Sequence, residues 1–199
     1  TNIPEGQVEM MPIANHQGEG SAVHEVPFSR EIYIEKGDFM VDAPKKYFRL
    51  APGKVVRLKG AYIIQCDNYI TDPESGEVTE VHCSYVENSR SGSDTSGVKA
   101  KGVLHWVSIE HAVPVEVRLY DRLFAAPEPG AESGDFLDDV NPESLVVIPT
   151  AYAEPFLAEA SIEDRYQFMR IGYFCLDTES KEDKLIFNRT VSLKDSWKK

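Results

Sequence analysis

One basic stretch of the chain has the residue types of a nucleic-acid site. Residues 43–66 hold six cations and no acid, although the whole chain has a formal net charge of -12. Such a stretch attracts phosphates, and aromatic rings between the cations can stack on unpaired bases. The same residues also suit a solvated strand edge, where cations discourage aggregation, so charge alone leaves both interpretations open. The cations are Lys45, Lys46, Arg49, Lys54, Arg57 and Lys59, and the aromatic residues are Tyr47, Phe48 and Tyr62.

Because this stretch contains no acid of its own, we expect most of its cations to be exposed to solvent. Burial of Arg49 and Arg57 in ion pairs with carboxylates would instead favour a structural role. Two classes of partner fit an exposed basic surface. One is RNA, and the other is an acidic protein or small ligand bound by a stand-alone β-barrel.

A second polar cluster spans residues 165–170, with the sequence RYQFMR. Gln167 offers both a donor and an acceptor, and Arg170 offers a planar fork of donors, so either side chain could hold a base edge. The alternative is that Arg170 pairs with a nearby carboxylate such as Asp164. The pattern alone favours this second interpretation.

Catalytic signatures are weak. Asp138 and Asp139 are adjacent, and on a strand adjacent side chains face opposite ways, so we expect them to be solvated rather than to act as the acidic pair of a hydrolase. We expect His105 to be a hydrogen-bonded neighbour of Trp106 rather than a metal ligand. The sequence has no glycine-rich phosphate loop and no nucleophile elbow. We therefore predict no catalytic residue and no metal site in this chain.

Length and composition fit one large or two small globular domains of 199 residues in all. No apolar run approaches the ~20 residues that cross a bilayer, and the first residues do not resemble a signal peptide. The chain begins with Thr1, so we expect it to be a piece of a longer protein. Three widely spaced cysteines predict unpaired thiols in a reduced, cytoplasmic protein; they are Cys66, Cys83 and Cys175.

The dominant pattern is a series of short runs of β-branched and aromatic residues separated by turn signals. It predicts an all-β fold of barrels with a few short helices. Short helices are expected to begin at Asp42-Ala43-Pro44 and at Asn141-Pro142-Glu143. Residues 72–76 predict a tight turn. The predicted strands are 31–34, 55–58, 62–64, 78–85, 103–107 and 115–120, and the predicted loops are 15–25, 88–97 and 127–134, of which 88–97 is expected to be disordered because it has nothing apolar to bury.

Several blocks of the sequence resemble the C-terminal region of glutaminyl-tRNA synthetases. They follow one another in the same order and span essentially the whole chain, so the resemblance is specific. The related glutamyl enzymes of archaeal and eukaryotic type share the fold, but the last two blocks favour the glutaminyl family. The blocks are VPFSREIYI at 26–34, KGVLHWVS at 101–108, PVEVRLYDRLF at 114–124, NPESL at 141–145, GYFCLD at 172–177 and FNRTV at 187–191.

The resemblance implies the anticodon-binding region of a class I synthetase, made of two tandem β-barrels with one inserted into the other. The distal barrel would span residues 26–107, and the proximal barrel would combine 1–25 with 108–199. The catalytic domain of the family would lie outside this chain. The fragment would therefore bind tRNA but aminoacylate nothing, and it would hold no cofactor. The full-length enzyme would use ATP with Mg²⁺, together with glutamine.

The family also suggests roles for individual residues, because its anticodon bases are splayed apart and read in separate pockets. Arg49 is similar to the arginine that grips the third anticodon base, a guanine, and Arg57 to the one at the first base. Gln167 and Arg170 match the pair that reads the central uracil. Lys59 stands where other members often have a second arginine, and Phe48 where some have a lysine. Lys45 and Lys46 would contact the tRNA beside them. The expected partner is a glutamine tRNA, with no DNA or membrane, and the protein is expected to be a monomer.

Overall fold

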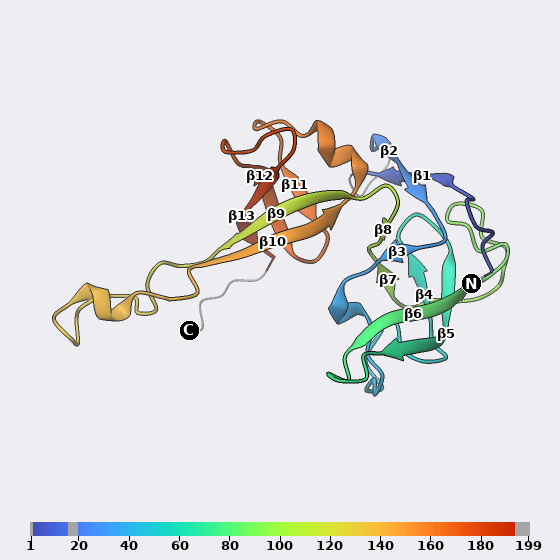
Figure 1. Cartoon of the computed structure of the whole chain (residues 1–199), viewed down its shortest axis with the longest axis horizontal. Helices are drawn as coiled ribbons and strands as arrows, with labels where there is room; N and C mark the ends of the chain where they lie inside the picture. Colours follow the sequence, from blue (N-terminus) through green and yellow to red (C-terminus); the bar gives the residue numbers. More distant parts are fainter. Residues whose placement is uncertain (1, 16–19, 194–199) are drawn as a thin grey trace. The chain divides into compact units, whose positions relative to one another are not determined.

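In the computed structural model the chain folds into two compact units, residues 1–112 (unit 1) and residues 113–199 (unit 2). The structure describes residues 2–15 and 20–193. Within these ranges the regular structure is almost entirely β-strand, with short 3₁₀ helices at Lys36–Asp38 (η1), Phe136–Asp139 (η2) and Pro155–Glu159 (η3) (Figure 1). The predicted all-β class with a few short helices is confirmed, and the sheets are compatible with barrel-like domains.

No helix among the described residues is long and apolar enough to cross a membrane. The domain boundaries expected from the family, with 1–25 joined to 108–199, stay a prediction. By compactness alone the chain divides after Ala112.

Unit 1 contains two strand pairs. β1 (Glu9–Ala14) and β2 (Val23–Phe28) form an antiparallel hairpin. β3 (Ile32–Tyr33) pairs with β8 (Val107–Ser108). β2 begins inside the loop expected at residues 15–25, and residues 16–19 of that loop lie outside the described ranges.

Unit 1 also contains a four-stranded sheet in the order β6-β5-β4-β7. β4 (Val55–Leu58) runs antiparallel to β5 (Ile63–Thr71) and parallel to β7 (Val103–Leu104). β5 in turn pairs with β6 (Val78–Tyr85). The connection from β6 to β7 crosses over to the far edge of β4, and three of its residues, Ser89, Asp94 and Gly102, contact Arg57.

The core of unit 1 explains why β4 forms where it does. Val56 and Leu58 are buried, while Val55 and Arg57 alternate with them on the other face. Full burial of a valine or leucine side chain contributes about 1.5–3 kcal/mol to stability. The buried face contacts a core that includes Trp106 and Phe28, whose rings meet edge to face at 5.1 Å. This alternation fixes the register and directs Arg57 away from the core.

Unit 2 is a five-stranded sheet in the order β10-β9-β13-β12-β11. β9 and β10 run side by side as a long antiparallel ribbon (Figure 1). β13 is parallel to β9 and antiparallel to β12, and β12 forms a hairpin with β11. The strands are β9 (Val113–Tyr120), β10 (Leu145–Ala153), β11 (Tyr166–Phe168), β12 (Gly172–Leu176) and β13 (Leu185–Ser192).

An ion-pair network joins β9 to a residue that follows β12 and a residue that precedes β13. Arg118 Nε donates to Glu116 Oε1 at 2.8 Å, and Arg118 Nη1 lies 3.3 Å from Asp177 Oδ2. Lys184 Nζ pairs with the second oxygen of Glu116 at 2.8 Å. The Lys184 and Arg118 contacts hold the pKa of Glu116 below its ordinary value. A backbone hydrogen bond from Glu179, with the amide of Asn188, similarly lowers the pKa of Asp177. Both carboxylates therefore remain charged, although each is largely buried.

The two short helices predicted to start at proline are wrong. Asn141 Oδ1 does accept a hydrogen bond from the Glu143 amide at 3.0 Å, but the chain then enters β10 instead of a helix. At Pro44 the carbonyl accepts from Tyr47 in a single turn. A side chain that caps a helix can equally close a turn. The capping pattern was therefore read correctly, but the residues that follow it do not form a helix. The predicted turn at 72–76 is confirmed by Asp72, which caps Glu74 and Ser75.

Candidate nucleic-acid interface

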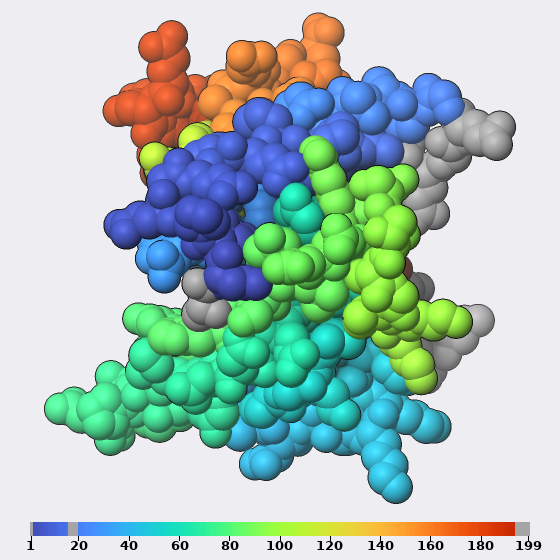
Figure 2. All heavy atoms as spheres, turned by 90° about the vertical axis from the view of Figure 1, so that its right-hand side faces the viewer, coloured from blue at the N-terminus to red at the C-terminus, as the bar shows by residue number. Residues whose placement is uncertain are grey.

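The basic segment, defined here as residues 45–59, is an irregular stretch followed by β4. Backbone hydrogen bonds hold it at several points. Leu50 donates to the carbonyl of Asp38 at 3.0 Å, and Gly53 donates to the carbonyl of Cys66 at 3.0 Å. The side chain of Leu50 is buried in the core. The segment is therefore attached to the sheet through its backbone, and part of it lies at the surface of unit 1 (light blue to cyan in Figure 2).

The cations differ in exposure. Lys45, Lys46 and Lys54 are exposed, and Lys59 is half-buried at the end of β4. The Arg49 side chain is 42% exposed, against 22% for Arg57. The expectation of an exposed basic surface is thus met by three lysines, while the two arginines differ from it and from each other.

Arg49 is held at one of its nitrogens. Arg49 Nη1 donates to the carbonyl of Gly37 at 2.9 Å and lies 3.2 Å from Oδ1 of Asp38, a carboxylate with no exposed area. Within the part of the chain that the structure describes, Nη2 and Nε of Arg49 have neither a hydrogen bond nor an ion pair. The guanidinium keeps a two-donor edge that could meet a base or a phosphate.

Arg57 is held more completely. Its Nη1 donates to the carbonyls of Ser89 at 2.7 Å and Ala61 at 3.2 Å. Its Nη2 forms an ion pair with Asp94, which belongs to the connection between β6 and β7. Hydrogen bonds from Ser96, and then the contact with Arg57, lower the pKa of Asp94. Arg57 therefore fastens this connection onto β4.

These ion pairs correct the expectation that the basic segment lacks acidic partners. The acids come from Asp38, which precedes the segment, and from Asp94, which follows it. For Arg57 the observed burial favours a structural role in this state. For Arg49 the exposed half of the side chain leaves both a structural and a binding role available.

The three aromatic residues of the basic stretch at 43–66 also differ in exposure and contacts. Phe48 is 53% exposed, and Lys101 Nζ lies 5.7 Å from the centre of its ring. Tyr47 donates its hydroxyl to the carbonyl of Gly37 at 3.0 Å. Tyr62 does not offer a free face, because it packs against Phe28 and Tyr85. The suggestion that Tyr62 stacks on a base is therefore wrong, and Phe48 is the exposed ring.

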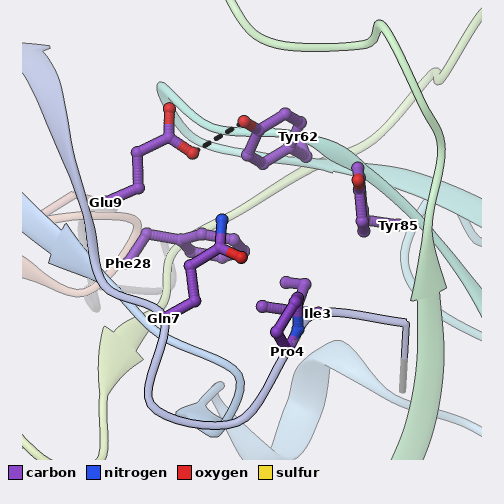
Figure 3. A pocket seen from close by; sticks show the side chains of 7 residues that line it. All are labelled: Ile3, Pro4, Gln7, Glu9, Phe28, Tyr62 and Tyr85. Carbon is purple, nitrogen blue, oxygen red and sulfur yellow. Dashed lines mark hydrogen bonds between the residues drawn. The ribbon is translucent and has the colours of Figure 1, made fainter.

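A small pocket on unit 1 contains Tyr62 (Figure 3). The Tyr62 hydroxyl donates to Oε2 of Glu9 at 2.7 Å, and Arg90 Nη1 pairs with the other oxygen at 3.0 Å. Burial and then the bond to Glu9 raise the pKa of Tyr62 to about 12. Both oxygens of the Glu9 carboxylate are therefore engaged by side chains of unit 1. The lining residues are Ile3, Pro4, Gln7, Glu9, Phe28, Tyr62 and Tyr85.

In unit 2, Gln167 and Arg170 lie on the β11–β12 hairpin. Tyr166 and Phe168 pack on the core, so the alternation leaves Gln167 exposed on the opposite face of β11. Arg170 is exposed in the turn with a φ of +66°, and the turn closes with a hydrogen bond from Ile171 to Phe168 at 2.9 Å. The two residues thus share one exposed hairpin. Oδ2 of Asp164 accepts from the hydroxyl of Tyr166 at 3.1 Å and from the amide of Ser161 at 3.2 Å, and the alternative that pairs Arg170 with this carboxylate stays a prediction.

Other candidates take structural positions. Asp139 Oδ2 accepts from the amide of Gly130 at 2.8 Å, and Asp138 is exposed on η2. Trp106 is buried and donates to the carbonyl of Lys59 at 3.0 Å. Cys66, Cys83 and Cys175 form no disulfide. Among the described residues, no three histidine, cysteine or acidic side chains are placed to hold a metal ion.

Comparison with known proteins gives the same family for both halves of the chain. Residues 1–86 and 103–177 each match a family model described as tRNA synthetases class I (E and Q), anti-codon binding domain. Over its whole length the chain is 52% identical to a glutamine–tRNA ligase of Rhodopirellula baltica and 51% identical to that of Proteus mirabilis. It covers 33% and 35% of those proteins, respectively, so it spans about a third of their length.

The two matches have the same description and together cover most of the chain, in agreement with an all-β structure that presents a basic segment. The chain belongs to the anticodon-binding domains of the class I tRNA synthetases for glutamate and glutamine.

Proposed function

We propose that this chain is the anticodon-binding region of a glutamine–tRNA ligase and that it recognises the anticodon loop of glutamine tRNA. The observation that carries the proposal is the state of Arg49, a half-exposed guanidinium fixed at one nitrogen with a two-donor edge unengaged. Such an edge suits bidentate donation to O6 and N7 of guanine. The identity of about 50% with glutamine–tRNA ligases supports glutamine rather than glutamate as the amino acid.

The residues divide into two roles. Arg49 reads the third anticodon base, a guanine, and Gln167 with Arg170 reads the central uracil by hydrogen bonds to exposed base edges. Lys45, Lys46 and Lys54 bind phosphates and give affinity without sequence information. Lys59 and Arg57 belong to the first-base region, where Arg57 must either act through its remaining donors or exchange a present partner for RNA.

ATP- and glutamine-dependent chemistry is assigned to the part of the full-length ligase that this chain does not cover. The role of this region is to hold the correct tRNA, so that binding energy gained at the anticodon is available to the reaction elsewhere. Residence in the cytoplasm, a monomeric state and the absence of DNA binding stay predictions.

The proposal is tested by filter binding of the purified chain to a glutamine tRNA transcript at two salt concentrations. Phosphate contacts release counterions, so affinity should fall steeply with salt. The controls are a tRNA with an unrelated anticodon and a DNA hairpin of the same sequence. Weaker binding of both controls supports the proposal. Equal binding of all three, or binding that salt leaves unchanged, would favour a general polyanion site or a module for another partner.

A further inference from the structure

Asp38 is a buried carboxylate that contacts Arg49 of the basic segment. It is the last residue of η1, its side chain has no exposed area, and Oδ1 lies 3.2 Å from Arg49 Nη1. A carboxylate is costly to bury in its charged form without a cation nearby, and the guanidinium of Arg49 lies beside this one. Asp38 therefore constrains where the guanidinium of Arg49 can lie.

The backbone holds the two segments that carry this pair side by side. The carbonyl of Asp38 accepts from Leu50 at 3.0 Å, and the carbonyl of Leu50 accepts from Met40 at 3.1 Å. Phe39 and Leu50 form a parallel bridge between the two segments. The backbone next to Arg49 is thus hydrogen-bonded to the segment that carries Asp38.

The contacts with Gly37 and Asp38 involve only Nη1 of the Arg49 guanidinium. The carbonyl of Gly37 accepts a hydrogen bond from Nη1, and Oδ1 of Asp38 forms an ion pair with the same nitrogen, so two partners hold one end of the guanidinium. Resting on the proposed function, we infer that Asp38 is a positioning residue: it orients the Nε–Nη2 edge of Arg49 for the guanine of the anticodon. Asp38 itself touches no RNA.

Arg57 provides the contrast. Both of its terminal nitrogens are engaged, by two carbonyls and by Asp94, and its side chain is about half as exposed as that of Arg49. The carboxylate beside each arginine therefore has a different effect on the donors that remain available. Asp94 completes a set of contacts around Arg57, whereas Asp38 leaves one edge of Arg49 available.

The test uses this chain and RNA stem–loops of the glutamine anticodon with either guanine or adenine at the third position. The measured quantity is the ratio of the two dissociation constants, which does not change with the fraction of folded protein. Wild type should prefer guanine by about 5- to 150-fold, the range of one bidentate pair. Asp38→Asn keeps the shape of the side chain but removes its charge, and it should reduce this ratio by about 3- to 10-fold, within the range of coupling between two side chains in contact.

A double-mutant cycle separates positioning from a general effect. In an Arg49→Ala background, Asp38→Asn should leave the ratio unchanged, because Asp38 acts through Arg49. Asp42→Asn is the matched control: it makes the same charge change at an exposed residue close in sequence, and it should leave the wild-type ratio intact.

Three results overturn the inference. One is a ratio unaffected by Asp38→Asn, and another is an equal change in the Arg49→Ala background. The third is tighter binding of both RNAs by Asp38→Asn, which would mean that the carboxylate competes with RNA for Arg49. If wild type does not distinguish guanine from adenine at all, it is instead the proposed function that fails at this base.

Discussion

Arg57 and Asp94 form an ion pair that ties β4 to the connection between β6 and β7. This connection contains residues 88–97, which were expected to be disordered because they have nothing apolar to bury. Polar contacts hold them instead. Ser89 is fully buried and its hydroxyl accepts from the amide of Ile63 at 2.9 Å, while Asp94 accepts from both the amide and the hydroxyl of Ser96.

Asp94→Asn should therefore loosen this loop without unfolding unit 1. Amide hydrogen exchange in residues 88–97 should become faster, while exchange in β5 stays slow. Because the folded-state pKa of Asp94 is lowered, the ion pair is present above the ordinary aspartate pKa and is lost as pH falls through the lower folded value. Wild-type loop exchange, corrected for its intrinsic pH dependence, should approach that of the variant in acid. No difference between the two proteins at neutral pH would show that the ion pair does not hold the loop.

Gly102 should not tolerate a side chain. A Cβ at this position would lie 1.9 Å from the carbonyl oxygen of Phe48, and the carbonyl of Gly102 accepts from the Arg57 amide at 2.9 Å. Gly102→Ala should destabilise the chain by about 1–3 kcal/mol, because backbone must move to admit the methyl group.

Urea unfolding followed by the fluorescence of the buried Trp106 measures this effect. Gly37→Ala is the control, since its Cβ would meet only Arg49 Nη1 at an ordinary 3.7 Å. Equal stability of the two variants would contradict the close approach at Gly102.

Strand positions were predictable where one face of a strand is buried. The predicted 55–58 and 78–85 coincide with β4 and β6: every second residue of β4 is buried, and in β6 the alternate residues Val81, Cys83 and Tyr85 are partly buried and pack against the core. The partners of Arg49 and Arg57 were not predictable. Asp38 and Asp94 lie outside the basic stretch, and only the parallel pairing of β4 with β7 brings the second of them close. A search for acids limited to the same segment could not find them.

Among the side chains on which the proposed function rests, some positions were also predictable from the sequence and others were not. The exposure of Gln167 follows from alternation on β11, with Tyr166 and Phe168 on the core. The difference between Arg49 and Arg57 depends instead on which carbonyls and carboxylates surround each guanidinium. That difference is a property of tertiary structure, and no pattern of residue types expresses it.

Arg118→Met should destabilise unit 2 at neutral pH. The change removes the cation shared by Glu116 and Asp177, whose lowered pKa values show that the fold favours their charged forms. The loss should shrink as pH falls through those pKa values, because protonated carboxyls no longer need the cation.

Hydrogen exchange of β9 and β13 at pH 7 and in acid measures this dependence. Lys181→Met is the control, because it removes an exposed cation for which the structure shows no ion pair among the described residues. A destabilisation by Arg118→Met that is the same at both pH values would assign the effect to packing instead.

Tyr62 should titrate later than an ordinary tyrosine. Its folded pKa of about 12 exceeds the usual 10, so its contribution to stability is complete below pH 10 and is lost as pH rises from 10 toward 12. The difference in ultraviolet absorbance between wild type and Tyr62→Phe during alkaline titration isolates this one hydroxyl. A midpoint near 10 in folded protein would mean that neither the burial of this hydroxyl nor its bond to Glu9 persists in solution.

The most direct measurement of the central claim is binding of anticodon stem–loops altered at single bases to three variants of this chain. Arg49→Ala should cost about 1–3 kcal/mol, mostly against RNA with the correct third base, and Gln167→Ala should relax the choice of the central base. Lys45→Ala should weaken every RNA about equally and flatten the salt dependence, since a phosphate contact carries no sequence information. If Arg49→Ala and Lys45→Ala instead weaken every RNA to the same extent, the basic segment is an electrostatic cradle, and base readout by Arg49 is wrong.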